Sequence, residues 1–97
     1  MMVLATLRVR PQHGYALIEA IRARSGGVFD LPEGTIYPAL YRLERAGLLR
    51  SMWSPGTGRR RRRVYELTER GGEALSERTE EWAELSRGLA SVIAAAS

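Results

Sequence analysis

The sequence predicts one small, mainly helical domain that carries a two-stranded β-hairpin and ends in a long helix. Residues 33–46 hold apolar side chains at helical spacing. Two strand-like segments, residues 48–53 and 62–67, flank a connection rich in glycine and proline. The segment 69–95 then repeats large apolar residues about every seven positions. With 97 residues, the chain has room for one domain of low burial, which association with a second copy would stabilise.

Two shorter helices are expected before this part. Residues 1–9 form an apolar segment that is closed by Pro11, and residues 13–25 carry an apolar stripe. The consecutive glycines Gly26 and Gly27 are expected to end the second helix. A brief extended link then leads to the third helix.

The ends of the two later helices are marked by recognisable residues. Gly47 is suited to a left-handed C-terminal cap, and Thr68 to an N-cap of the last helix. Pro38 lacks an N–H group, so we expect an irregular or bent start to the helix over 33–46.

Five consecutive arginines lie at the hairpin tip and run into its return strand. Like charges this dense repel one another, so the run is stable only where water or a polyanion reaches it. Side chains alternate along a strand, so only some of the five can touch one ligand at once. We expect at least two of them to contact DNA phosphates or a narrow minor groove, and the alternative is a solvated, mobile loop. The run comprises Arg59, Arg60, Arg61, Arg62 and Arg63.

Charge divides the chain into two parts. Residues 1–63 hold twelve arginines and four acidic residues, whereas residues 64–97 hold three arginines and seven glutamates. The basic part is the candidate polyanion surface, and the acidic tail is expected to point elsewhere. All fifteen basic residues are arginine, which suits bidentate phosphate and guanine contacts but equally reflects codon bias in a GC-rich genome.

Several classes of function lack a basis in the sequence. There is no cysteine and one histidine, so neither a disulfide framework nor a metal site is expected. No catalytic triad or phosphate-cradling glycine loop is present, so we expect no enzyme and no cofactor. No apolar run approaches the length of a membrane span, and the expected compartment is the cytoplasm.

The exposed face of the third predicted helix is the candidate for reading DNA. Such a helix needs donors and apolar tips near its start and cations further along. The alternative is a solvated face whose tyrosines pack on the scaffold, with Tyr37 in particular partly structural. The face comprises Thr35, Tyr37, Pro38, Tyr41, Arg42 and Arg45.

Three further side chains have candidate roles around this face. His13 and Tyr15, at the start of the second helix, are candidate phosphate contacts. For His13 a local cap or packing role is the favoured alternative, and an effector-site role is a further one. Trp53 is expected to pack under the hairpin and hold its angle.

The last helix is too long to bury its apolar stripe on so small a domain, so a second copy of the chain is the expected partner. Trp82 is read first as the largest residue of this seam and alternatively as part of an effector site. The candidate dimer residues are Leu75, Trp82, Leu85, Leu89 and Val92.

Several motifs resemble the PadR-like transcriptional regulators from about residue 3 to residue 75. They are His13-Gly14-Tyr15, Glu33-Gly34-Thr35-Ile36-Tyr37-Pro38-Ala39-Leu40, Arg42-Leu43-Glu44 before Ala46-Gly47-Leu48, and Tyr65-Glu66-Leu67-Thr68 before Gly71. The resemblance implies a winged helix-turn-helix fold and a dimeric repressor. It also implies a dimerisation helix at the C-terminus and often a small effector near the dimer interface. The chain departs from the family in a shorter first helix, in Arg10 before the proline and in a denser arginine run.

Together these features predict a winged helix-turn-helix DNA-binding unit over residues 1–68 and a dimerisation helix over 69–97. The expected function is sequence-specific binding of a pseudo-palindromic DNA operator by a homodimer, as a repressor released by a small aromatic or hydrophobic effector. Two alternatives are a nonspecific architectural nucleic-acid binder and a winged-helix protein-interaction module.

Overall fold

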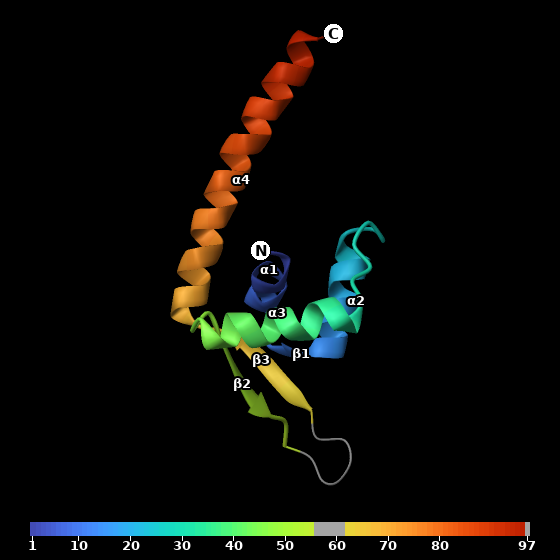
Figure 1. The fold of residues 1–97 in the computed structure, drawn as a ribbon, viewed down its shortest axis with the longest axis vertical. Coiled ribbons are helices and arrows are strands. Elements are labelled where there is room, and N and C mark those ends of the chain that lie inside the picture. Colours follow the sequence, from blue (N-terminus) through green and yellow to red (C-terminus); the bar gives the residue numbers. More distant parts are fainter. Residues whose placement is uncertain (56–61, 97) are drawn as a thin grey trace.

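The residues that the structure describes form four helices and a small sheet, and the molecule measures 60 × 28 × 21 Å along its principal axes (Figure 1). The computed structural model describes residues 1–55 and 62–96. The elements in chain order are α1 Met2–Val9, β1 Gln12–His13, α2 Gly14–Arg24, α3 Glu33–Arg45, β2 Leu49–Trp53, β3 Arg63–Leu67 and α4 Glu69–Ala95. The four helices and the hairpin strands match the sequence expectation within one or two residues at each end.

The sheet has three antiparallel strands in the order β1-β3-β2, where two were expected. Gln12 pairs with Tyr65 and His13 with Val64, so β1 adds a short edge strand to the hairpin. A two-residue strand carries no alternation of its own, and it forms because β3 presents a free edge. The additional strand ties the start of α2 to the hairpin.

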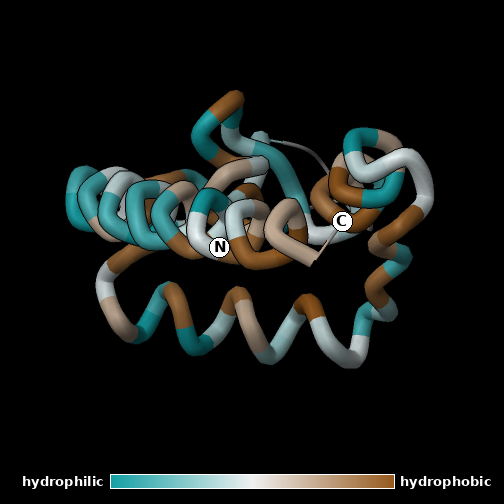
Figure 2. The backbone as a smooth tube through the Cα atoms, turned by 90° about the horizontal axis from the view of Figure 1, so that it is seen from above, coloured by the Kyte–Doolittle hydropathy of each residue, from teal (hydrophilic) through white to brown (hydrophobic). Residues whose placement is uncertain are grey.

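The hydrophobic core lies where α1, α2 and α3 meet the sheet. Its most buried large side chains are Leu4, Leu17, Ile36 and Leu40. Figure 2 shows the hydrophobic turns of α3 facing the rest of the molecule and its hydrophilic turns facing outward. The core therefore fixes which face of α3 is left for solvent or a ligand.

Leu75 also belongs to this core. Its side chain is 4 % exposed and lies in the same buried cluster. The prediction that placed Leu75 in a dimer seam is wrong, since the first two turns of α4 lie against α1 and β3 and use this side chain there. The exposed apolar stripe of α4 begins beyond it.

The C-terminus of α3 is a complete Schellman motif. Gly47 has a φ of 80°, as its predicted left-handed cap requires. The Gly47 N–H donates to the Glu44 carbonyl, and the Leu48 N–H donates to the Leu43 carbonyl, both at 3.0 Å. At the other end, the N–H groups of Thr35 and Ile36 both reach the Pro32 carbonyl. This first turn is tighter than a regular α-helix, and the helix then continues through Pro38.

Thr68 caps α4 as predicted and also holds the end of α3. Its hydroxyl accepts the Gly71 N–H at 3.1 Å and donates to the Gly47 carbonyl at 2.7 Å. We expect Thr68→Ala to lower the free energy of unfolding by about 1–2 kcal/mol, because a cap and a second hydrogen bond are lost together. Denaturant unfolding would measure this.

Thr79→Ala is the matched control for that change. The Thr79 hydroxyl donates only to the Leu75 carbonyl one turn earlier in α4. Its loss should change stability by no more than about 0.5 kcal/mol. Equal losses for the two variants would show that Thr68 does not join the two helices.

Candidate nucleic-acid interface

All six residues predicted to read DNA lie on the exposed side of α3. They project from the side opposite Ile36 and Leu40, which the core holds buried. The helix places them within about three turns, roughly 15 Å along its axis, so they can address one extended ligand together. They are Thr35, Tyr37, Pro38, Tyr41, Arg42 and Arg45.

Tyr41 and Arg45 form a pre-oriented pair on this face. The Arg45 Nη1 atom donates to the Tyr41 hydroxyl at 3.0 Å, and its guanidinium lies 5.6 Å from the tyrosine ring centroid. The two residues are one helical turn apart, the spacing at which side chains on a helix surface meet. The pair holds the guanidinium near the helix without neutralising its charge.

Tyr37 partly serves to pack α3 against α2, which agrees with the alternative interpretation that this residue is partly structural. A Cβ atom added to Gly14 would lie 2.7–2.8 Å from the Tyr37 ring, so the glycine allows α2 and α3 to approach. The Tyr37 side chain nevertheless remains 43 % exposed. It therefore packs against α2 with one side of the ring and remains accessible on the other.

The hairpin arginines divide between two environments. Arg59, Arg60 and Arg61 lie outside the described residues. Of the two described, Arg62 lies beside His13, whereas Arg63 contacts Ser51 and Glu44. The two neighbouring positions thus have different partners, although both side chains line one pocket together with His13 and Tyr37.

His13 performs the cap role that was its favoured alternative. Its Nδ1 atom accepts the Ala16 N–H at 3.2 Å, while Nε2 lies 2.9 Å from Arg62 Nη1. Both ring nitrogens face N–H donors, and an imidazolium has no acceptor to offer either. Burial, followed by the charge of Arg62, lowers the pKa of His13 from its ordinary value.

This lowered pKa predicts a pH dependence. Neutral His13 is favoured in the folded state, so its contribution to stability is present above the unfolded pKa of about 6.5 and is lost as pH falls through the lower folded value. We expect the His13 ring resonance, from the only histidine, to titrate below that value by NMR. His13→Asn, which keeps a capping side chain, should remove this part of the fall in Tm toward pH 5. A midpoint at or above 6.5 would contradict this assignment.

Two adjacent pockets run between α3 and the hairpin, and we call them together the hairpin groove. One pocket, of about 550 Å³, lies beside the end of α3, and the other, of about 370 Å³, lies beside the start of α2. They share Arg63 and Tyr65. The residues that line the groove are His13, Gly14, Tyr15, Tyr37, Tyr41, Glu44, Arg45, Arg62, Arg63 and Tyr65.

The groove brings the predicted phosphate contacts next to the recognition face. Tyr15 is exposed at the start of α2, and His13 lies beside it. Burial raises the pKa of Tyr65, an effect that the charge of Arg63 opposes. Its hydroxyl is therefore a protonated donor at neutral pH. The groove offers several hydroxyl and guanidinium donors to one ligand.

The expected place of Trp53 is wrong. Its side chain is 52 % exposed and is not packed under the hairpin. The Arg63 guanidinium lies 5.6 Å from the Trp53 ring centroid, and the two residues are cross-strand partners. An indole can cover an arginine from the neighbouring strand, which substitutes for burial in the core.

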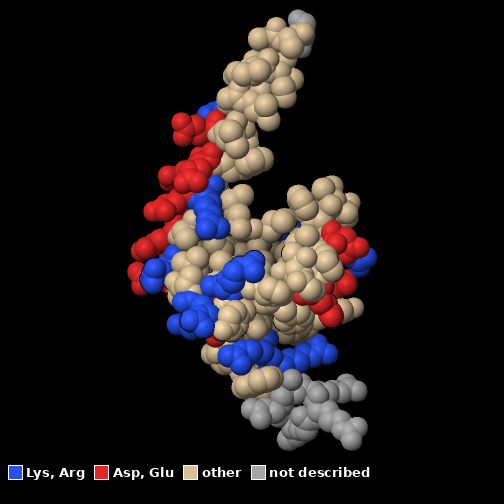
Figure 3. Space-filling view, viewed as in Figure 1, with Lys and Arg blue, Asp and Glu red and all other residues tan. Residues whose placement is uncertain are grey.

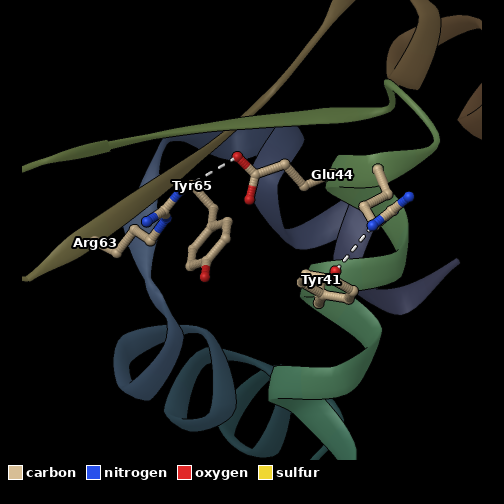
Figure 4. Close-up of a pocket in the computed structure, with 5 residues that line it drawn as sticks. Tyr41, Glu44, Arg63 and Tyr65 are labelled. Carbon is tan, nitrogen blue, oxygen red and sulfur yellow. Dashed lines mark hydrogen bonds and ion pairs between the residues drawn. The ribbon is translucent and has the colours of Figure 1, made fainter.

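Glu44 and Ser51 belong to the site although the sequence did not predict a role for either. The Ser51 hydroxyl donates to the Glu44 carboxylate at 2.6 Å and accepts from Arg63 Nε at 2.7 Å. Figure 4 shows Glu44 and Arg63 meeting. One available signal was the position of Glu44 four residues after the buried Leu40, which turns it toward the sheet. Ser51 gave a weaker signal, as a small polar residue two positions after the buried Leu49.

Charge separates along the molecule. Figure 3 shows acidic side chains following α4, while arginines lie over the head of the domain and toward the hairpin. The acidic residues of α4 are thus directed away from the groove, as the division of the sequence predicted. A polyanion would approach the hairpin end and avoid the helix.

The outer part of α4 keeps an uncovered apolar stripe. Trp82 is 56 % exposed and Val92 is 70 % exposed, with Leu85, Leu89 and Ile93 between or beside them. Trp82 also lines an open pocket of about 300 Å³ with Met1, Arg78, Glu81 and Leu85. An apolar stripe of this length on one helix is typical of a contact surface.

The family model described as the transcriptional regulator PadR-like family matches residues 3–77. The chain belongs to the PadR-like family of transcriptional regulators. This PadR-like chain has the four helices and winged sheet expected of that membership. The family model ends within α4, just beyond Leu75, so it covers the whole hairpin groove and stops short of the exposed stripe.

Solved structures share the fold. A transcriptional regulator from Clostridium thermocellum is 30 % identical with a TM-score of 0.81, and the match covers 91 % of this chain and 84 % of that one. Bacillus subtilis PadR, solved in complex with operator DNA, is 22 % identical with a TM-score of 0.71, over 78 % of this chain and 42 % of that one. At that identity the second likeness concerns the fold alone.

Among curated proteins, an uncharacterized 37.1 kDa protein in a transposon of Streptomyces fradiae is 40 % identical over 86 residues. The match covers 89 % of the PadR-like chain but 23 % of that protein, so the chain spans about a quarter of this relative's length. Within the described part of the chain, no helix is both long and apolar enough to cross a bilayer. Nor do these described residues include three potential metal-ligating side chains in one group.

Proposed function

We propose that this PadR-like chain binds duplex DNA sequence-specifically, with α3 in the major groove and the hairpin along the adjacent backbone or minor groove. The observation that carries the proposal is the exposed α3 face beside the hairpin groove, where hydroxyl and guanidinium donors converge. Base edges in the major groove are distinguished by such donors, and phosphates are bound by arginines. The operator DNA bound to Bacillus subtilis PadR supports the choice of ligand.

The same proposal assigns α4 to a symmetric homodimer. Its exposed residues Trp82, Leu85, Leu89 and Val92 follow a three-four spacing that suits a helix pair. Two heads joined this way would read two half-sites about one helical turn apart. This arrangement supports a pseudo-palindromic operator, with residues 1–68 as the DNA-binding unit and residues 69–97 as the dimerisation helix.

We further propose that the protein is a repressor in the cytoplasm that an aromatic or hydrophobic effector releases. Trp82 supports this, because it combines an exposed indole with an open pocket on the dimer helix. A ligand bound there acts only if it prefers a dimer whose heads are out of register with the operator.

A nonspecific architectural role is the second candidate, and the five-arginine run favours it. Phosphate contacts carry no sequence information, so a protein that relied on them alone would bind any duplex. The third reading, a protein-interaction module, requires that no salt-dependent duplex binding occurs.

Selection of bound duplexes from a random pool would test the proposal. We expect a palindromic consensus whose half-sites are about one helical turn apart. In competition at physiological salt, the selected duplex should bind about a thousandfold or more tightly than unrelated duplex. Equal binding of all duplexes would favour the architectural role, and absence of binding would favour the interaction module.

A further inference from the structure

Glu44, Ser51 and Arg63 form one network that joins the recognition helix to both strands of the hairpin. Ser51 Oγ donates to Glu44 Oε2 at 2.6 Å and accepts from Arg63 Nε at 2.7 Å. Arg63 Nη2 lies 3.7 Å from the same carboxylate oxygen. Figure 4 shows Glu44 from α3 and Arg63 from β3 meeting across the groove, with Tyr65 between the walls.

This network commits Arg63 to the protein itself. Its Nε atom, its Nη2 atom and the face of its guanidinium are directed to Ser51, Glu44 and Trp53 respectively. The Glu44 carboxylate offsets the charge of Arg63. Arg45, on the opposite wall, contacts only the neutral Tyr41 hydroxyl and ring and keeps its charge.

Stability alone does not account for such a network. Glu44 and Arg63 retain 30 % and 46 % side-chain exposure, and an ion pair this exposed contributes about 1 kcal/mol at most. What the contacts do fix is geometry, because Ser51 sits in β2, Arg63 in β3 and Glu44 in the last turn of α3. The angle between the hairpin and the recognition helix depends on them.

We propose that Glu44 is a positioning residue that sets the sequence specificity of duplex binding. It holds the hairpin against α3 through Ser51 and Arg63, and it withholds the Arg63 guanidinium from phosphates of any sequence. Its carboxylate also lines the groove and repels a backbone that enters there. The role rests on the proposed duplex binding. In it, one acidic residue lowers the affinity of the protein for DNA of unrelated sequence.

Glu44→Gln tests the proposal, with binding to the selected operator and to unrelated duplex measured across a range of salt concentrations. Released Arg63 should gain a phosphate contact, so the slope of log affinity against log salt for unrelated duplex should steepen by about 0.9. Unrelated duplex should bind about fivefold to tenfold more tightly, and the ratio of operator to unrelated affinity should fall about tenfold.

Glu66→Gln is the matched control. Glu66 lies on β3 and pairs with Arg50 of β2, so this variant also removes one negative charge and one ion pair from the hairpin. That pair lies on the opposite face of the sheet from Ser51 and Arg63 and makes no link to α3. We expect its affinity ratio to stay within about twofold of the unmodified chain.

Two results would overturn the proposal. Equal loss of both affinities with an unchanged salt slope would mean that Glu44 merely supports the fold. Matching responses of Glu44→Gln and Glu66→Gln would mean that only net charge matters.

A measurement without DNA separates this inference from the proposed function. The Arg63 side-chain Nε–H should exchange slowly with solvent in the free protein and faster in Glu44→Gln and Ser51→Ala, as followed by NMR. Fast exchange in the unmodified chain would refute the network whatever the protein binds. Slow exchange in a chain that shows no operator preference would instead refute the proposed function, and the specificity role with it.

Discussion

Gly71→Ala is expected to destabilise the protein by about 3 kcal/mol, a large part of the stability of so small a domain. An alanine Cβ at this position would lie 2.1 Å from the Leu48 carbonyl oxygen and 2.7 Å from Leu67 Cδ1. The nearest atom belongs to the backbone and cannot rotate away. Relief would require α4 to move off the segment between α3 and β2.

That movement would propagate because the Leu48 carbonyl is already in use. It accepts the Thr68 N–H at 3.1 Å, and Leu48 itself completes the Schellman motif that ends α3. Displacing it would disturb the recognition helix, β2 and the start of α4 together. We therefore expect Gly71→Ala to lower Tm and also to weaken DNA binding in the protein that remains folded.

Two alanine substitutions in the same helix provide controls. A Cβ at Gly72 would meet only Leu67 Cδ2 at 4.0 Å, and one at Gly88 would meet nothing within 4 Å. Both variants should gain up to about 1 kcal/mol from the higher helix propensity of alanine. Denaturant unfolding of the three variants gives the comparison, and a stable Gly71→Ala protein would show that the segments are not in contact.

Trp82→Arg is expected to produce monomers whose affinity for the operator is lower by a factor of at least about a hundred. The α4 stripe from Trp82 onward is more than half exposed, and Leu75 is the last residue of this helix in the buried core cluster. A guanidinium in the middle of a helix pair would be buried without a partner. Two separated DNA-binding units would lose the gain in operator affinity that comes from linking two half-site contacts in one dimer.

Light scattering and operator titration measure the two parts of this expectation. Ala83→Arg is the control, because it adds the same charge next to Trp82 but about 100° round the helix. That variant should remain dimeric. Intact dimers in Trp82→Arg would refute the seam, whereas monomers with unchanged operator affinity would refute the role of the dimer in binding.

Much of the fold was predictable because its signals are local. The apolar period of α3, the glycine at its end and the threonine before α4 specify those helices within one or two residues. The exposed face of α3 followed directly from the same period. The position of Leu75 did not follow, because the heptad spacing of α4 does not reveal where the helix leaves its own domain.

The site was predictable in its residue types and not in its pairings. His13 and Arg62 are 49 positions apart, and Ser51 and Arg63 are 12 apart on different strands. Neither pairing has a sequence spacing that marks it. The added strand β1 was also not predictable from sequence spacing, because two residues beside a proline become a strand only when they pair with the edge of a formed hairpin.

The sequence by itself determined the helices, the hairpin, the family and the face that α3 presents, because backbone propensity, caps and side-chain period act over a few residues. Only the tertiary structure decided that Arg62 and Arg63 of the arginine run lie against His13 and Glu44. Contacts of that kind depend on how α2, α3 and the hairpin pack, and packing is set by the shape of buried side chains throughout the domain. The residues that carry charge were readable in advance, whereas the charges left free for a ligand were not.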